Sequence, residues 1–284
     1  MTAAYRPTAS RRRRIGHVSG IKIALQLLYH IIPISERGQI KMQYIIAAEP
    51  KDIKNAFSFK KPLAHMAYKI GADARLYRAE GSDTTEGGYM ILSADGEIHS
   101  DDHTVTEIVN ECKERHFSGV FANFGASPLL TSLSKALSEQ NLRMIVPEPL
   151  GNDFKNAWVL ISSALSGGSL RRRLSEAANT YGAGRIVLDV ERVFRVFTPP
   201  VPDGQGRPLS REEYETLKAR VSPTPFFSYD LCCNYFIFFE DEQPHIVLYD
   251  NVGSIKSKLL IASSLRIDKA MFLYSETYDI MLNL

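Results

Sequence analysis

The fold of this chain is decided by a stretch in its middle, Phe117-Ser118-Gly119-Val120-Phe121-Ala122-Asn123-Phe124-Gly125. The residues before it, 104–115, place apolar side chains at helical spacing. The stretch itself is short and apolar and is closed by a glycine, which is typical of a buried strand. We therefore expect a helix at 104–115 that leads into a buried strand, whose last residues lie at one end of a sheet.

The chain from Met42 onward repeats this alternation of helix and strand. Strands are predicted at residues 43–47, 75–78, 89–93, 119–124, 142–147, 157–162, 185–191 and 269–275. Further helices are predicted at 129–140 and 170–181. Such alternation indicates a parallel sheet with crossover helices, and eight strands in about 240 residues fit a (β/α)8 TIM barrel of the α/β class.

A proline-rich stretch at 198–206 interrupts the alternation after the seventh strand. It is followed by a predicted helix at 211–220, which Ser210 and Glu213 would begin as a capping box. Three short runs of aromatic and β-branched residues follow at 226–231, 235–240 and 245–249. We interpret residues from about 192 to 250 as a small antiparallel α+β insertion before the last strand of a TIM-barrel domain at 42–284.

The first 41 residues differ in character from this domain. Four arginines at 11–14 precede an apolar stretch at 15–34, which polar residues such as Lys22 and His30 interrupt too often for a membrane span. A positive segment before an apolar one is typical of an export signal, but no small-residue cleavage site follows. We expect an N-terminal extension outside the core, or an over-long gene start, and a cytoplasmic location, with export to a cell wall or spore as the alternative.

The composition argues against several classes of function. A net charge of +2 without an aromatic-interleaved basic stripe gives no reason to expect a nucleic-acid partner. Cys112, Cys232 and Cys233 cannot build a disulfide framework, and they lack the spacing of zinc ligands. No glycine-rich phosphate loop occurs. We therefore expect no metal and no cofactor.

Two charged runs are expected to be structural. Asp101-Asp102-His103 precedes a predicted helix, where acidic residues cap the N-terminus and complement its dipole. Arg171-Arg172-Arg173 lies within the predicted helix at 170–181, and we interpret it as a solvated helix face rather than an anion site.

The stretch at 117–125 resembles the signature strand of glycoside hydrolase family 18, the chitinase-like barrels. That signature reads aromatic, Asp, Gly, aliphatic, Asp, any residue, Asp, aromatic, Glu. In this register the signature acids fall on Ser118, Phe121, Asn123 and Gly125. Residues 249–258 and the insertion are similar to the family barrels found in bacterial spore and cell-wall hydrolases, and the resemblance covers roughly residues 85–276.

The resemblance implies a damaged enzyme. In the family, the Glu protonates the leaving oxygen and the neighbouring Asp steers the N-acetyl group of the substrate, so Gly125 removes a proton donor and Asn123 removes a charge. The Asn123 amide could still bond an N-acetyl oxygen. The implied function is binding of an N-acetylglucosamine-containing glycan, of chitin or peptidoglycan type, by a catalytically impaired barrel.

A rival register places the acid on the seventh strand, because Ile186-Val187-Leu188-Asp189-Val190-Glu191 also ends in Asp-x-Glu. Asp189 and Glu191 then share one face of the strand at the end of the barrel where active sites lie. The alternative function is an active glycosidase that uses Glu191 with Asp189 or Glu148. Since the family signature lies on the fourth strand, we prefer the first register.

Other acidic residues end predicted strands and complete the candidate site. The substrate-binding candidates are Asn123, Asp95, Asp230 and Glu276. The plain alternative is a polar rim in which Glu191 pairs with Arg192 or Arg195. A third hypothesis, a non-catalytic barrel kept for protein interaction, predicts an exposed aromatic patch formed by Phe226, Phe227, Tyr235 and Phe238.

Overall fold

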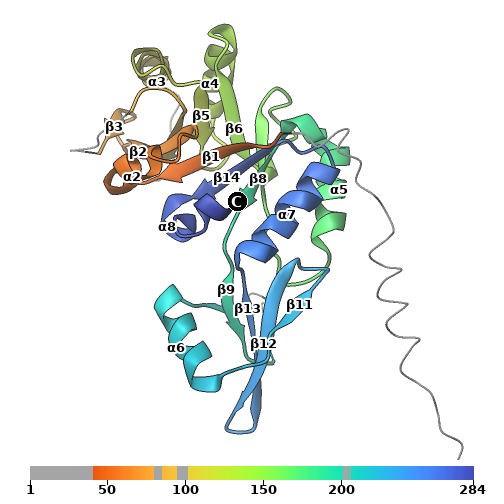
Figure 1. The fold of residues 1–284 in the computed structure, drawn as a ribbon. Helices are drawn as coiled ribbons and strands as arrows, with labels where there is room; N and C mark the ends of the chain where they lie inside the picture. Colours follow the sequence, from red (N-terminus) through yellow and green to blue (C-terminus); the bar gives the residue numbers. More distant parts are fainter. Residues whose placement is uncertain (1–40, 80–84, 95–101, 201–203, 205) are drawn as a thin grey trace, which may run out of the picture. The chain divides into compact units, whose positions relative to one another are not determined.

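Eight parallel strands form a closed barrel in the computed structural model, which describes residues 41–79, 85–94, 102–200, 204 and 206–284. The barrel strands are β1 Gln43–Ala48, β2 Leu63–Ile70, β4 Tyr89–Ala94, β5 Gly119–Ala122, β6 Arg143–Pro147, β7 Trp158–Ser162, β8 Ile186–Val190 and β14 Lys269–Leu273. Strand β1 pairs with both β14 and β2, which closes the sheet (Figure 1). The predicted TIM barrel is therefore confirmed, while residues 1–40 of the proposed N-terminal extension lie outside the described residues.

The second barrel strand is not the one that the sequence pattern indicated. Residues 75–78 were expected to form it, and this prediction is wrong: β3 Leu76–Arg78 is an antiparallel partner at the outer edge of β2. Strand β2 itself pairs in parallel with β1 and β4. Its register shifts between His65 and Tyr68, so the alternation of side chains that marks a strand in sequence is broken there.

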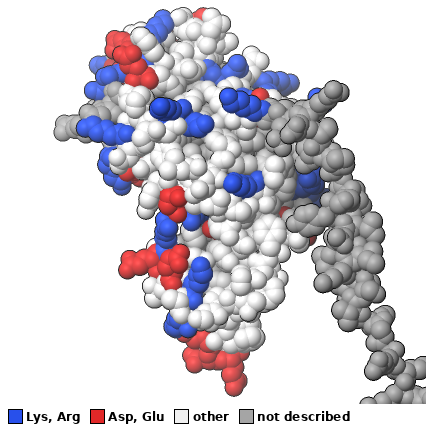
Figure 2. Space-filling model, in the orientation of Figure 1, with Lys and Arg blue, Asp and Glu red and all other residues white. Residues whose placement is uncertain are grey.

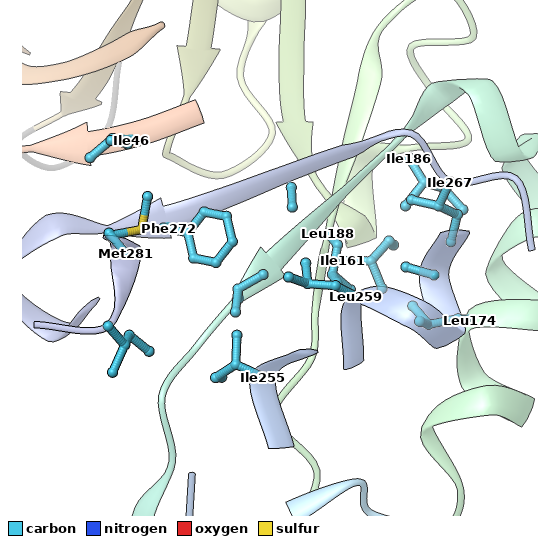
Figure 3. Packing of buried hydrophobic residues seen from close by; sticks show 14 of the residues in the cluster. Ile46, Ile161, Leu174, Ile186, Leu188, Ile255, Leu259, Ile267, Phe272 and Met281 are labelled. Atoms are coloured by element: carbon cyan, nitrogen blue, oxygen red, sulfur yellow. The ribbon is translucent and has the colours of Figure 1, made fainter. Parts of the chain in front are cut away.

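Helices cover the outside of the barrel. They are α2 Ile53–Phe57, α3 Asp102–Glu114, α4 Pro128–Glu139, α5 Leu170–Tyr181, α7 Val252–Ser264 and α8 Tyr274–Thr277, with short 3-10 turns η1 Pro50–Asp52, η2 Glu148–Leu150, η3 Ala183–Arg185 and η4 Met281–Asn283. Their apolar faces pack on outward side chains of the strands. Figure 3 shows one such layer, in which Ile255 and Leu259 of α7 lie beside Leu188 of β8. None of the described helices is long and apolar enough to cross a membrane.

The interior of the barrel is filled by side chains. The buried inward residues are Ile45, Ala47, Ala64, Tyr89, Ile91, Phe121, Ile145, Val187 and Met271. Trp158, the only tryptophan of the chain, packs against this cluster from the first position of β7. The Arg143 guanidinium carbon lies 5.2 Å and Lys269 Nζ 4.7 Å from its ring centroid, so two cations flank the indole at the N-terminal end of the barrel.

A second sheet lies between β8 and β14 in the sequence. Its five strands, β9 Phe194–Phe197, β10 Arg207–Pro208, β11 Phe226–Ser228, β12 Cys233–Glu240 and β13 Gln243–Tyr249, are antiparallel in the order β10-β9-β13-β12-β11. Helix α6, Arg211–Val221, begins with the expected capping box of Ser210 and Glu213. Its Tyr214 is buried against Phe194 and Tyr249, so α6 covers one face of this sheet.

Candidate functional site

Three carboxylates gather at the C-terminal end of the barrel. Asp189 follows Val187 at the next inward position of β8, and Glu191 comes two residues later. Glu276 lies on α8, directly after β14, and β14 pairs with β8. Burial, together with the negative charges of Glu191 and Glu276, raises the pKa of Asp189 to about 7. The barrel thus brings Asp189, Glu191 and Glu276 together at its rim.

The neighbours of Asp189 are held by hydrogen bonds. Ser162 lies beside Asp189 in the adjacent strand, and its hydroxyl donates a hydrogen bond to Glu191 Oε1. The backbone N–H of Arg192 lies 3.4 Å from Glu276 Oε2. Desolvation, with Glu191 as a further negative charge, raises the pKa of Glu276. A carboxyl group with a perturbed pKa at the functional end of a barrel is a candidate for acid or base chemistry.

The remaining predicted acids are not part of this group. The Glu148 carboxylate accepts a hydrogen bond from Arg173 Nη2. Asp230 is exposed, and its carbonyl oxygen accepts the N–H of Leu170 at 2.8 Å. Asp95 lies outside the described residues. Among the described residues, no group of His, Cys, Asp and Glu side chains could hold a metal ion.

Arg192, the residue after Glu191, binds residues of the C-terminal segment. The Arg192 Nη1 atom donates to Asp279 Oδ1 at 2.7 Å and to the carbonyl oxygen of Glu276 at 3.1 Å. The side chain of Arg192 is only 9% exposed, and Asp279 also pairs with Arg211 of α6 at 3.0 Å. Arg192 therefore ties the start of the second sheet to the C-terminal segment after β14.

The stretch at 117–125 forms β5, the fourth strand of the barrel. Ser118 is exposed just before the strand, and Phe121 is buried in the barrel interior. Asn123 and Gly125 follow the strand at its C-terminal end and are exposed. A Cβ atom built on Gly125 would meet no atom within 4 Å, so the position has room for a side chain.

Gly119, by contrast, is required by the packing of the barrel. A Cβ atom at this position would lie 2.0 Å from the carbonyl oxygen of Arg143 on β6. The backbones of β5 and β6 approach too closely there for any residue with a side chain.

Two cavities adjoin the rim. The first, of ≈ 400 Å³, is lined by Ser162, Ala164, Leu165, Ser166, Gly167, Arg173, Glu191, Val193 and Arg195. The second, of ≈ 500 Å³, is mostly apolar, and its lining includes Phe197, Phe227, Tyr235, Ile246 and Leu248. Ser166 lines both, and the second cavity lies on the face of the five-stranded sheet that α6 leaves uncovered. Together they extend the site from the rim onto the second sheet.

The predicted aromatic patch is divided between two faces of the second sheet. Phe226 is 49% exposed, and its ring stacks on Tyr235 at 5.4 Å. Phe238 lies on the opposite face and packs toward α6. Exposed apolar side chains at Tyr229, Ile237 and Phe239 were not predicted. In Figure 2 the lower right of the molecule, over β11 and β12, carries few charged atoms, whereas acidic side chains gather at the tip of the β12–β13 hairpin.

Sequence reasoning missed the residues that line the first cavity besides Glu191 and Arg195. Ser162 ends β7, whose other residues are apolar, and it belongs to no motif. Arg173 was assigned to a solvated helix face, because helical spacing alone does not show which arginine of a run turns inward. Of the remaining lining residues, Ala164, Leu165, Ser166 and Gly167 belong to the loop between β7 and α5, and Val193 lies between β8 and β9; neither segment carries a motif.

These features define a (β/α)8 barrel with a carboxylate rim, a small α+β sheet before the last strand and a groove that joins the two. Several solved structures share this fold. The spore cortex-lytic enzyme SleL of Bacillus megaterium is 15% identical, with 85% of this chain and 72% of that chain covered at a TM-score of 0.60. A family 18 N-acetylglucosaminidase of Paenibacillus barengoltzii is 13% identical, with 85% of this chain and 98% of that chain covered at a TM-score of 0.60.

A family 18 chitinase of Cycas revoluta, solved in complex with (GlcNAc)4, is 13% identical, with 84% of this chain and 97% of that chain covered at a TM-score of 0.58. No protein-family model matches the chain, and no curated protein matches it. The chain therefore has the fold of the glycoside hydrolase family 18 chitinases, as its resemblance predicted.

Proposed function

We propose that this protein is a catalytically impaired, family 18-like barrel that binds an N-acetylglucosamine-containing glycan. The observation that carries the proposal is the absence of a carboxylate at the end of β5, where Asn123 and Gly125 are exposed at the C-terminal end of the fourth strand. Gly125 has no proton donor, and loss of a general acid typically costs ~10²- to 10⁴-fold in rate.

The groove beside the rim supports retained binding. Aromatic rings at Phe197, Phe227 and Tyr235 line its apolar part, and such rings can stack on the apolar faces of sugar rings. Asn123 adds an amide that can bond an N-acetyl group. The Cycas revoluta chitinase that shares the fold binds (GlcNAc)4, which supports the same class of ligand for this chain.

The test compares hydrolysis of a chromogenic N-acetylglucosamine oligomer by the wild type and by Gly125→Glu combined with Asn123→Asp. We expect no measurable hydrolysis by the wild type and a gain of about 10²-fold over background in the double variant, because the double variant regains the proton donor and the steering charge. Gly125 has room for the new side chain, so folding should be unaffected.

Gly184→Glu is the matched control, since a Cβ atom there also meets nothing within 4 Å and Gly184 precedes β8 at the opposite end of the barrel. A similar gain in this control, or no gain in the double variant, would contradict the proposed register. Calorimetric titration with the unmodified oligomer tests whether the protein binds this glycan.

The second candidate function is an active glycosidase that uses Asp189 and Glu191. It is favoured by the pKa of about 7 at Asp189, since a carboxylic acid that stays partly protonated at neutral pH can act as a general acid. Hydrolysis by the wild type that is lost in Glu191→Gln or Asp189→Asn, but kept in Glu148→Gln, would establish this function in place of the first.

A further inference from the structure

Strand β12 carries apolar side chains on both of its faces. Its central run consists of aromatic and aliphatic residues alone, Tyr235-Phe236-Ile237-Phe238-Phe239. An antiparallel strand with one face in water normally alternates apolar and polar residues, whereas a continuous apolar run is typical of a strand that is covered on both faces. The sequence of β12 therefore indicates cover on both faces of the second sheet.

The described part of the chain covers one of these faces well and leaves the other exposed. Phe236 and Phe238 pack toward α6, in the cluster that contains Tyr214. Ile237 and Phe239 alternate with them and so point away from α6. They are 47% and 71% exposed, although both are large apolar side chains. This exposure is what the sequence of β12 does not predict.

Strand pairing places further apolar residues on the same exposed face. Ile246 lies directly opposite Ile237, and Pro244 lies opposite Phe239, in the ladder between β12 and β13. Phe226 lies on the neighbouring strand β11 and faces the same side. In Figure 2 this region over β11 and β12 carries few charged atoms. We call these five residues the apolar patch: Phe226, Ile237, Phe239, Pro244 and Ile246.

The chemistry of the apolar patch does not suit a sugar. Its side chains are hydrocarbon throughout and contain no group that could bond a hydroxyl. The ≈ 500 Å³ cavity lies on the same face but nearer the barrel, where Leu231 and Leu248 line it, and Ile246 borders both regions. The cavity also has hydroxyl groups, from Ser166, Ser228 and Tyr235. The apolar patch therefore fits an apolar protein surface better than a glycan.

The exposed area of the apolar patch matches what a small dimer interface needs. Since an aromatic side chain can bury roughly 150–250 Å², the exposed parts of Phe226, Ile237 and Phe239 amount to about 300 Å². Two copies of the patch that face each other would bury about 600 Å² of apolar surface. Because roughly 60% of an interface is apolar, the whole interface would reach about 1,000 Å², the size at which specific interfaces begin.

The charges at the tip of the β12–β13 hairpin select the orientation of such a pair. Glu240, Asp241 and Glu242 are exposed at this tip, and Arg220 pairs with Glu240 at 2.8 Å. Two sheets aligned tip to tip would bring these negative charges together. A twofold axis that lies between the sheets and crosses the strands places the two tips at opposite ends instead.

We propose that the apolar patch binds the same patch of a second copy of this chain, so that the protein forms a twofold symmetric dimer. The strands of the two copies run antiparallel across the interface, and the acidic tips lie at opposite ends. The dimer goes beyond the proposed glycan function and does not depend on it, because no residue of the apolar patch lines the ≈ 400 Å³ cavity beside the rim.

Analytical ultracentrifugation of the full chain over a range of concentrations tests the dimer. We expect a monomer–dimer equilibrium with a dissociation constant on the order of 10 µM, because an interface near the lower size limit gives weak affinity. A chain that sediments as a monomer up to roughly 200 µM, where such a dimer would predominate, overturns the proposal.

Two variants locate the interface. Ile237→Thr and Phe239→Thr, made separately, should each raise the dissociation constant by about tenfold or more, because a twofold interface loses the same apolar contact twice. Threonine suits a strand, so the second sheet should persist, and Phe239 lies near the end of β12 in case Ile237→Thr fails to fold. Phe57→Thr is the matched control, since Phe57 is an exposed aromatic residue on α2, outside the apolar patch. It should leave the dissociation constant unchanged.

The other outcomes contradict the proposal and identify what the patch contacts instead. A dimer that both variants leave intact uses a different surface. A monomer that binds phosphatidylcholine vesicles, and loses this binding in Phe239→Thr, would show that the patch contacts a lipid surface. A monomer in which the new thiol of Phe239→Cys resists alkylation would show that another part of the same chain covers the patch, because the native cysteines are buried in either case.

Discussion

Asp189 is a carboxyl group whose protonation changes between the folded and the unfolded chain at neutral pH. The side chain ionises near pH 3.9 when unfolded, and its pKa is about 7 in the folded barrel, because it is buried beside Glu191 and Glu276. Between these values the folded state keeps a proton that the unfolded state has lost. The contribution of Asp189 to stability is therefore most favourable below about pH 4 and is lost as the pH rises through 7.

Asp189→Asn should remove this dependence. We expect the variant to exceed the wild type in free energy of unfolding, and this excess to be about 2–3 kcal/mol larger at pH 8 than at pH 5, because most of the titration range lies between the two. Urea unfolding at both pH values measures the difference. Asp153→Asn is the control, since Asp153 lies exposed on a loop before β7. An Asp189→Asn effect that is the same at pH 5 and pH 8 would mean that the carboxyl group titrates normally.

Helix α7 depends on a buried ion pair at its start. The Lys258 Nζ atom lies 2.6 Å from Asp250 Oδ2, and the two side chains are 1% and 0% exposed. The Asp250 carboxylate also accepts the N–H of Val193 at 2.9 Å and the hydroxyl of Ser254 at 2.7 Å. One carboxylate therefore joins the first turns of α7 to the start of the second sheet.

Lys258→Met should lower the free energy of unfolding by about 3–5 kcal/mol, because it leaves the Asp250 charge buried without its partner. Adding Asp250→Asn should recover part of the loss, since the buried charge is then removed while an acceptor oxygen remains. Lys256→Met is the matched control on the same helix, where the lysine is exposed. Chemical denaturation checks all three. A loss in the control equal to that in Lys258→Met would argue against the ion pair.

At the scale of elements, the sequence predicted most of the barrel but not β2. Helices α3, α4 and α5 and seven barrel strands were found because their apolar residues recur at regular spacing, and α6 was found from its capping box, whereas the short helices α2 and α8 were not predicted. Strand β2 contains His65 and Lys69, and its bulge shifts the register after His65, so period-two reasoning does not detect it. Residues 76–78 do form a strand, as their sequence indicates. The local pattern, however, does not distinguish an antiparallel partner at the edge of β2 from a strand of the barrel.

At the scale of the whole molecule, closure of the barrel decides which predicted residues meet. Asp189 and Glu191 could be paired from sequence, because alternate residues of one strand share a face. Glu276 was a candidate at a strand end, but its place beside Asp189 follows from the pairing of β8 with β14, which is a long-range contact. Glu148 ends a strand as well, yet Arg173 from the next helix binds it. The sequence thus predicts which acidic residues lie at the ends of strands, but it does not predict which side chains they contact.

The indole at the base of the barrel makes the protein its own spectroscopic probe. Because Trp158 is the only tryptophan and lies inside the barrel, emission excited at the indole band reports on the barrel alone, while the second sheet contributes only tyrosine and phenylalanine. Far-ultraviolet circular dichroism reports on the barrel and on the second sheet together. We expect the two signals to give coincident urea transitions, because Arg192 and Asp250 join the two sheets. An indole transition at higher urea than the dichroism midpoint would instead show that the second sheet unfolds first, leaving an intact barrel without half of its groove.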